Sequence, residues 1–157
     1  MATQRLFCTF RVDGRLYGVD ILDVKEVTAE TTYTQVAHAP HEVLGLVNIR
    51  GHIYLALDLR RLLGIPAADL TIDSRLLLFK PSVGSAFGVV VDEISEIQTV
   101  DSTHIEAFIR NDHETAAVNV HRVDLIDAVC RLGGELLVVL NPRRFLAVVE
   151  QKLAATA

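Results

Sequence analysis

Alternating apolar and polar residues near the start of the chain predict a β-hairpin. Over residues 6–12 the side chains alternate between an apolar face and a more polar face, which is the period of a half-buried strand. Asp13 and Gly14 follow, and this pair favours a two-residue turn in which both central positions take positive φ. Residues 16–20 then form the expected return strand. For residues 21–27 the pattern is mixed and leaves open a helical turn followed by another strand.

Further apolar runs predict more strands, and capping residues predict two helices. The expected strands are 45–49, 53–57, 75–79, 86–91 and 135–140. Asp58 is a good N-cap for a short helix. Asn141, followed by Pro142, begins a closing helix that we expect to run to about Leu153. Residues 98–115 are polar and form the longest candidate loop.

An internal repeat relates the two halves of the chain. Residues 17–27 (YGVDILDVKEV) match residues 87–97 (FGVVVDEISEI) at an offset of 70. Later in the chain the offset is 83, at which residues 51–57 match 134–140 and the capping residues Asp58 and Asn141 coincide. The offset of 70 also places Leu6 on Leu76 and Gly14 on Gly84. Two halves that share one order of elements indicate a duplication.

The repeat predicts a mainly β architecture of two small barrels. Each half is long enough for a small closed barrel but not for a generous core of its own. We therefore expect one domain over residues 1–157. Its first subdomain covers about residues 15–75 and its second about 76–140, with the terminal segments packing across both. Two barrels side by side also create a groove, where partners tend to bind.

Composition narrows the possible functions. Of the 157 residues, 50% are hydrophobic and 22% are charged, which excludes a disordered chain. A net charge of −5 argues against nucleic-acid binding, which depends on neutralising phosphates. The N-terminus carries no basic-then-apolar signal and no apolar run is long enough to span a bilayer, so we expect a cytoplasmic protein without membrane insertion.

No pattern for catalysis or for cofactor binding stands out. Phosphate-binding loops, nucleophile elbows and zinc-protease motifs are absent from the sequence. His38 and His41 are separated by Pro40, which prevents the helix that would align them on a metal, and surface loop histidines are the simpler interpretation. Cys8 and Cys130 form no metal or redox motif, and Cys8 is expected to be an inert buried thiol. We therefore expect a protein that is not an enzyme and that holds no metal or cofactor.

A binding surface is the remaining candidate. Residues 45–51 (GLVNIRG) place Asn48 and Arg50 in an otherwise apolar hairpin. Arg50 has two interpretations: it caps local carbonyls or pairs with a nearby acid, or it presents its donors to a partner beside exposed aliphatic surface.

Four segments resemble the CheW-type chemotaxis adaptors, whose domain also occurs at the C-terminus of CheA histidine kinases. The segments are residues 17–27, 39–64 (APHEVLGLVNIRGHIYLALDLRRLLG), 87–97 and 133–146 (GGELLVVLNPRRFL). The resemblance implies two tandem five-stranded SH3-like β-barrel subdomains with short helices and a C-terminal helix. It also implies a non-enzymatic scaffold that couples the cytoplasmic tip of transmembrane chemoreceptors to the regulatory domain of a CheA-type histidine kinase. Such an adaptor would be recruited to membrane-associated receptor arrays.

The resemblance also implies which residues bind partners. The matching positions are Val24, Glu26, Gly45, Asn48, Arg50 and Gly51, to which Val47 is added for its place in the hairpin. We expect aliphatic surface near Val24 and Val47 to supply affinity, and Glu26 and Arg50 to set register. Gly51 has the alternative role of shaping the backbone. Leu55 replaces the proline that the family usually carries before its Asp-Leu-Arg motif, and residues 105–108 replace a Pro-rich stretch.

Other functions are less well supported. An adaptor of a non-flagellar pathway, such as twitching, biofilm formation or development, has the same sequence features. A small β-barrel nucleic-acid binder would show a basic groove with exposed aromatics, whereas this chain has no Trp and 6% aromatic residues. A small hydrolase would need a converging base and nucleophile, and no such pair can be named.

Overall fold

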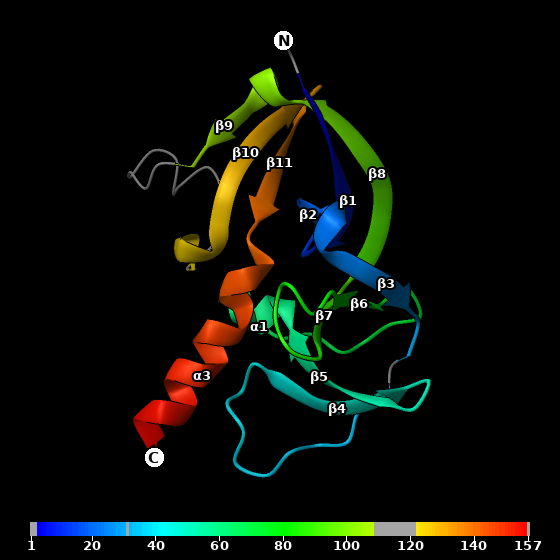
Figure 1. Ribbon diagram of the computed structural model, residues 1–157, viewed down its shortest axis with the longest axis vertical. Coiled ribbons are helices and arrows are strands. Elements are labelled where there is room, and N and C mark those ends of the chain that lie inside the picture. The colour runs from blue at the N-terminus through cyan, green and yellow to red at the C-terminus, as the bar shows by residue number, and fades with distance from the viewer. Residues whose placement is uncertain (1–2, 31, 109–121, 157) are drawn as a thin grey trace.

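The computed structural model describes residues 3–30, 32–108 and 122–156 (Figure 1). The strands are β1 (Gln4–Val12), β2 (Arg15–Asp20), β3 (Val24–Thr28), β4 (Val43–Ile49), β5 (His52–Asp58), β6 (Arg75–Phe79), β7 (Phe87–Val91), β8 (Glu93–Asp101), β9 (Ile105–Ala107), β10 (Ile126–Leu132) and β11 (Glu135–Leu140). The helices are α1 (Leu59–Leu63) and α3 (Phe145–Thr156), with short 3-10 helices η1 (Ile21–Asp23), η2 (Ser102–His104), η3 (Val123–Leu125) and η4 (Pro142–Arg144).

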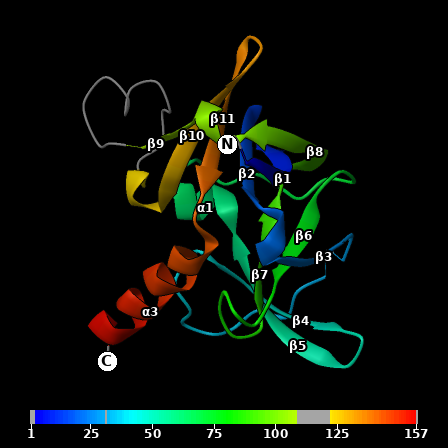
Figure 2. The ribbon, with the colours of Figure 1, turned by 45° about the horizontal axis from the view of Figure 1, so that its top comes forward.

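The strands form two sheets. Sheet A has the order β8-β1-β2-β11-β10-β9, and sheet B has the order β3-β6-β7-β5-β4. Figures 1 and 2 show sheet A above sheet B, with α3 leading away from the end of β11. The expected mainly β fold with a C-terminal helix is confirmed. Sheet A has six strands in place of the expected five, because the short β9 pairs with β10.

The internal repeat is present in the strand pairing. Leu55 pairs with Phe87 in the parallel ladder of β5 and β7, and the repeat equivalents Val138 and Tyr17 pair in the parallel ladder of β11 and β2. The bulge in β4 after Val43 likewise recurs at the equivalent place in β10. Because the two strand orders also match element by element, the sheets are two copies of one pattern.

The repeats exchange their first hairpins. Sheet B takes β3, β4 and β5 from the first repeat and β6 and β7 from the second, while β1 and β2 join β8, β10 and β11 in sheet A. The strands are therefore divided differently from the expected split at residues 75 and 76. The cause is the parallel pairing of β5 with β7 and of β11 with β2, which joins each hairpin to the other repeat.

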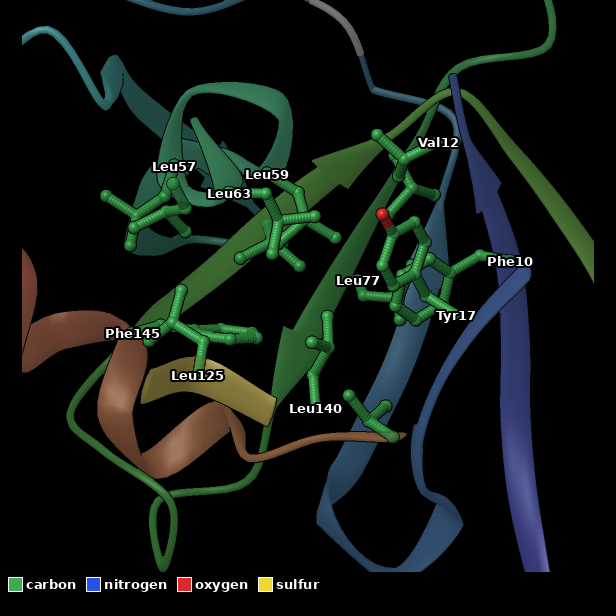
Figure 3. Close-up of a cluster of buried hydrophobic side chains, with 14 of the residues drawn as sticks. Phe10, Val12, Tyr17, Leu57, Leu59, Leu63, Leu77, Leu125, Leu140 and Phe145 are labelled. Carbon is green, nitrogen blue, oxygen red and sulfur yellow. The ribbon is translucent and has the colours of Figure 1, made fainter. Parts of the chain in front are cut away.

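Three clusters of apolar side chains make up the core. One lies within sheet A around Phe7 and Leu137, and one lies within sheet B around Val47 and Leu76. The largest lies between the sheets, where side chains of both sheets meet those of α1 and α3 (Figure 3). It includes the buried ring of Phe79, whose centroid lies 5.1 Å from that of Phe87 and 6.0 Å from that of Phe145. Each sheet thus buries the apolar face of the other, which neither sheet could bury alone.

Capping residues begin the helices as the sequence predicts. The Asp58 side chain accepts a hydrogen bond from the N–H of Arg60, and Asn141 does the same for Arg143. The closing helix continues through η4 and α3 to Thr156, slightly beyond the expected end. Residues 21–27 form η1 followed by β3, as one of the interpretations allowed. No helix within the described ranges is long and apolar enough to cross a membrane.

Two local expectations are wrong. Residues 98–107 are not a loop: β8 continues to Asp101, and η2 and β9 follow. They looked like a loop because β8 is an edge strand with mostly exposed, polar side chains. The rest of the predicted loop, from residue 109, lies outside the described residues. The predicted match of Leu6 with Leu76 is wrong by one residue. Cys8 pairs with Val19, and Leu77 pairs with Val89, the repeat equivalent of Val19. Cys8 is therefore equivalent to Leu77.

Candidate partner-binding surface

Arg50 and Glu26 join the β4–β5 turn to β3. The Arg50 Nη1 donates to Glu26 Oε1 at 2.8 Å, and Nη2 lies 2.8 Å from Oε2. The Arg50 side chain is 76% exposed, whereas that of Glu26 is 20% exposed. Arg50 therefore does pair with a nearby acid, as one interpretation held. The pair involves Nη1 and Nη2, and a guanidinium carries five N–H groups, so this exposed side chain keeps further donors beyond those used by Glu26.

The backbone at Arg50 is in an unusual conformation for a residue with a side chain. Arg50 has φ of +52° and Gly51 has φ of +87°, and the N–H of Gly51 donates to Asn48 Oδ1 at 2.8 Å. A left-handed conformation costs a non-glycine residue about 1–2 kcal/mol. In the second repeat the equivalent position is Gly133, with φ of +58°. The fold alone would thus be better served by glycine at position 50.

Asn48, Gly51 and Gly45 shape the hairpin. Asn48 and Gly51 close the turn through their hydrogen bond. Gly45 has φ of +149°, and a Cβ added there would lie 2.4 Å from the carbonyl oxygen of Thr34. That close approach lets residue 34 form a bridge to Leu46 along the outer edge of β4. Asn48 and Gly51 therefore shape the turn that carries Arg50, and Gly45 shapes the strand that leads into it.

The exposed aliphatic residues differ from those that the sequence suggested. Val47 is only 4% exposed and belongs to the inner cluster of sheet B, and Val24 is half-buried against the cluster between the sheets. Val27, Leu46 and Ile53 are instead exposed, by 40%, 37% and 53%. Val27 lies on β3 together with Glu26. Leu46 and Ile53 lie on β4 and β5, which are joined by the turn that contains Arg50. Sequence analysis missed these three because a continuous apolar run does not reveal which face is inward.

A pocket of about 410 Å³ opens where β2 and β11 end side by side. Two ion pairs line it: Arg5 Nη2 lies 3.0 Å from Asp20 Oδ2, and Arg143 holds both oxygens of Asp23 at 3.0 Å. These hydrogen bonds raise the pKa of the Arg143 guanidinium. Leu22 also lines the pocket and is 71% exposed. The sequence predicted a groove between the barrels but named none of these residues.

Two repeat-equivalent arginines form ion pairs that link the repeats to each other. Arg60 of the first repeat donates to both oxygens of Asp92, at 3.0 and 2.7 Å, and its equivalent Arg143 of the second repeat holds Asp23. Burial raises the pKa of Asp92, but hydrogen bonds from Arg60 and from the Asp13 backbone outweigh it and hold that pKa below its ordinary value. These bonds fix the ends of the two sheets relative to each other.

The described residues contain no arrangement suited to metal chemistry. Within the ranges that the structure describes, no group of three or more His, Cys, Asp or Glu side chains could hold a metal ion. Cys8 and Cys130 are both buried, and burial raises the pKa of each thiol. A protonated thiol is a poor nucleophile.

Comparisons with known proteins agree with this picture. The CheW-like domain family model matches residues 6–150. "Chemotaxis protein CheW" of Rhizobium meliloti (strain 1021) is 32% identical over 102 residues, 65% of each chain. The protein of that name from Klebsiella aerogenes is 25% identical over 148 residues, 94% of this chain and 84% of that one. "Protein PilI" of Pseudomonas aeruginosa is 32% identical over 89 residues, 57% of this chain and 49% of that one.

The chain matches 65% of the length of the Rhizobium meliloti protein and 66% of the length of "Probable chemotaxis protein CheW" of Rhizobium etli, slightly less than two thirds of each. Among solved structures, "scaffolding protein TtCheW" of Thermoanaerobacter tengcongensis has the same fold. Its TM-score is 0.77 at 23% identity, over 88% of this chain and 89% of that one. The chain therefore belongs to the CheW-like domain family.

Proposed function

We propose that this protein is a scaffold adaptor of chemosensory signalling. It couples the cytoplasmic tip of transmembrane chemoreceptors to the regulatory domain of a CheA-type histidine kinase. It works in the cytoplasm, recruited to membrane-associated receptor arrays, and needs no cofactor. Family membership supports the general role, and the observation that carries the site is Arg50, an exposed arginine in a left-handed conformation where the second repeat has glycine.

Energetics support a binding role for Arg50. An exposed ion pair such as that with Glu26 contributes at most about 1 kcal/mol to folding. Left-handed backbone at a non-glycine residue costs a similar amount. Arg50 therefore adds little to stability, whereas its unused N–H groups can bind a partner's carboxylate or carbonyl oxygens. Docking would remove the Arg50–Glu26 pair from water. An arginine buried in an interface often contributes a large share of the binding energy.

Each residue of the surface then has a role in binding the kinase regulatory domain. Glu26 orients Arg50, and Arg50 makes the contact. Gly45, Asn48 and Gly51 shape the β4–β5 hairpin. Val47 packs in the inner cluster of sheet B, and Val24 packs against the cluster between the sheets. The exposed aliphatic side chains in this part of sheet B would pack against the partner. They are Val27, Leu46 and Ile53.

The chemoreceptor tip would bind in the groove between the sheets. The pocket at the ends of β2 and β11 combines the exposed Leu22 with the charged pairs Arg5–Asp20 and Arg143–Asp23. A receptor segment with one apolar residue and flanking charges complements such a lining. Its place is separate from the β4–β5 turn, so both partners could bind together.

A non-flagellar signalling pathway is the second candidate. What favours it is the match to "Protein PilI", at 32% identity over 89 residues. The two candidates share the adaptor mechanism and differ only in which receptor and kinase are bound.

Affinity purification from the host would test both. Wild-type protein should recover a CheA-type kinase and chemoreceptors, identified by mass spectrometry, and their identity names the pathway. Arg50→Ala should lose the kinase. Arg122→Ala, which removes an exposed ion pair with Asp124 beside α3, is the matched control and should retain it. Recovery of neither partner by the wild type would overturn the proposal.

A further inference from the structure

A second pocket, of about 370 Å³, lies next to the β4–β5 turn. His52 and Ile53, the first residues of β5, form one side of it, and Lys25 of β3 contributes another. The pocket is separate from the groove at the ends of β2 and β11, with which it shares no lining residue. Its volume falls within the range of ligand-binding pockets.

Each polar side chain that lines this pocket can donate a hydrogen bond. Lys25 Nζ donates to the Tyr54 hydroxyl at 2.8 Å and lies 5.5 Å from the centre of the ring. An ammonium group has three N–H donors, and the Tyr54 hydroxyl, which accepts from Lys25, still has its own proton to donate. Ser85 and His52 line the same pocket, and none of its lining residues is acidic.

The remaining surface of the pocket is apolar. Ile53 is 53% exposed, and it lines the pocket together with Pro81 and Ala86. A ligand that suits both sides carries an anionic group on an aliphatic stem. Carboxylates fit because charge-assisted hydrogen bonds from an ammonium and a hydroxyl are stronger than neutral ones.

The second repeat does not have this arrangement. The equivalents of Lys25 and Tyr54 are Ser95 and Leu137, so no lysine–tyrosine pair recurs in sheet A. The two sheets share strand order and register, so the fold does not require this pair. The pair is therefore a feature of the surface that carries Arg50.

We propose that this pocket binds an acidic side chain of a partner protein, a glutamate or aspartate that adjoins an aliphatic residue. A protein partner is favoured over a free small acid because the pocket is continuous with the surface described above: the exposed Ile53 belongs to both, and His52 directly follows the turn that carries Arg50. The aliphatic neighbour packs on Ile53 while the carboxylate meets Lys25 and Tyr54. This inference extends the proposed function, because the segment belongs to the partner that Arg50 contacts.

The first test uses small probes on the full chain labelled with ¹⁵N. Titration with 4-methylpentanoate should shift the backbone amide signals of Ile53 and Ala86 in a saturable way, and 4-methylpentanamide should bind about tenfold more weakly or not at all. Lys25→Met should weaken binding of the acid about tenfold, whereas Lys25→Arg should largely retain it. If Lys25→Met perturbs the spectrum as a whole, Tyr54→Phe, which removes only the hydroxyl, replaces it. Equal binding of acid and amide, or no saturable shift, would overturn the site.

Peptides then distinguish the source of the carboxylate. Acetyl-Leu-Glu-Leu-amide should bind more tightly than both acetyl-Leu-Gln-Leu-amide and the free acid. Tighter binding of the free acid would assign the pocket to a small carboxylate and overturn the partner interpretation. Neither experiment contains a kinase or receptor, so failure of the pocket is distinguishable from failure of the adaptor role.

Discussion

Gly88→Ala should destabilise the protein far more than Gly18→Ala, although the two glycines are repeat equivalents. Gly88 lies in the middle of β7, opposite Leu78 on one side and Ala56 on the other. A Cβ added there would lie 2.3 Å from the carbonyl oxygen of Leu77 and 3.0 Å from Leu78 Cδ2. The carbonyl belongs to the backbone of a central strand, so it cannot move aside without disturbing the ladder.

Gly18 offers more room. Its added Cβ would lie 3.2 Å from Leu137 Cδ1, the end of a flexible side chain, and 3.4 Å from the carbonyl oxygen of Cys8. Overpacking of a rigid core costs about 1–3 kcal/mol, and a contact of 2.3 Å with backbone should reach the upper part of that range. At Gly18 a smaller clash is offset by the roughly 0.5–1 kcal/mol that alanine gains over glycine within a strand. We expect a net change of less than about 1 kcal/mol there.

Thermal and urea denaturation would measure the difference. For a chain of this size, each kcal/mol lowers the melting temperature by about 2–4 °C, so Gly88→Ala should melt roughly 4–12 °C below the wild type. Gly18→Ala should stay within about 4 °C of it. Equal losses, or a larger loss for Gly18→Ala, would refute the argument that β7 is packed against β6 more closely than β2 is against β1.

Other substitutions test particular contacts. Tyr17→Phe removes a buried hydroxyl that has no hydrogen-bond partner among the described residues, and burial raises its pKa to about 12. The melting temperature should therefore stay unchanged or rise. A clear fall would contradict the absence of a hydrogen bond to this hydroxyl. Gly45→Ala should lower stability by roughly 2 kcal/mol and weaken kinase binding as well, because the new Cβ meets the Thr34 carbonyl and displaces β4; an unchanged urea midpoint would contradict this. Asp92→Asn should reduce the loss of folding stability at acid pH. Arg60 lowers the pKa of Asp92 in the folded protein, so the Arg60–Asp92 pair stabilises the fold above the ordinary carboxyl pKa. This stabilisation is lost as the pH falls through the lowered folded-state pKa of Asp92. Urea midpoints compared between pH 7 and pH 3 would measure it, and parallel curves for the two proteins would exclude the role.

The sequence predicted the equivalence of the two halves but not how their strands pair. Matching residues identify β2 with β7 and β5 with β11, and the structure keeps this register to the residue. Equivalence does not say whether a hairpin joins its own repeat or the other one, since both choices bury the same side chains. The exchange is decided by the parallel ladders, which are long-range contacts that no local pattern encodes.

At the candidate site, residue types were easier to predict than surroundings. The sequence singles out Arg50 as a candidate, and the structure confirms one of its two interpretations, the pairing with an acid. The burial of Val47 and the exposure of its neighbour Leu46 could not be read from the sequence, because the hairpin is apolar on both faces. The contact between Lys25 and Tyr54 joins residues on different strands, so only the folded chain brings the two side chains together.

The measurement that tests the adaptor role most directly is the affinity of the purified protein for the regulatory domain of its CheA-type kinase, obtained by isothermal titration calorimetry. The wild type should bind, and Arg50→Ala should bind at least about tenfold more weakly while its melting temperature stays within a few degrees, as expected for an exposed interface arginine. Arg122→Ala should match the wild type in both. Undiminished binding by Arg50→Ala, or no binding by the wild type, would contradict the account.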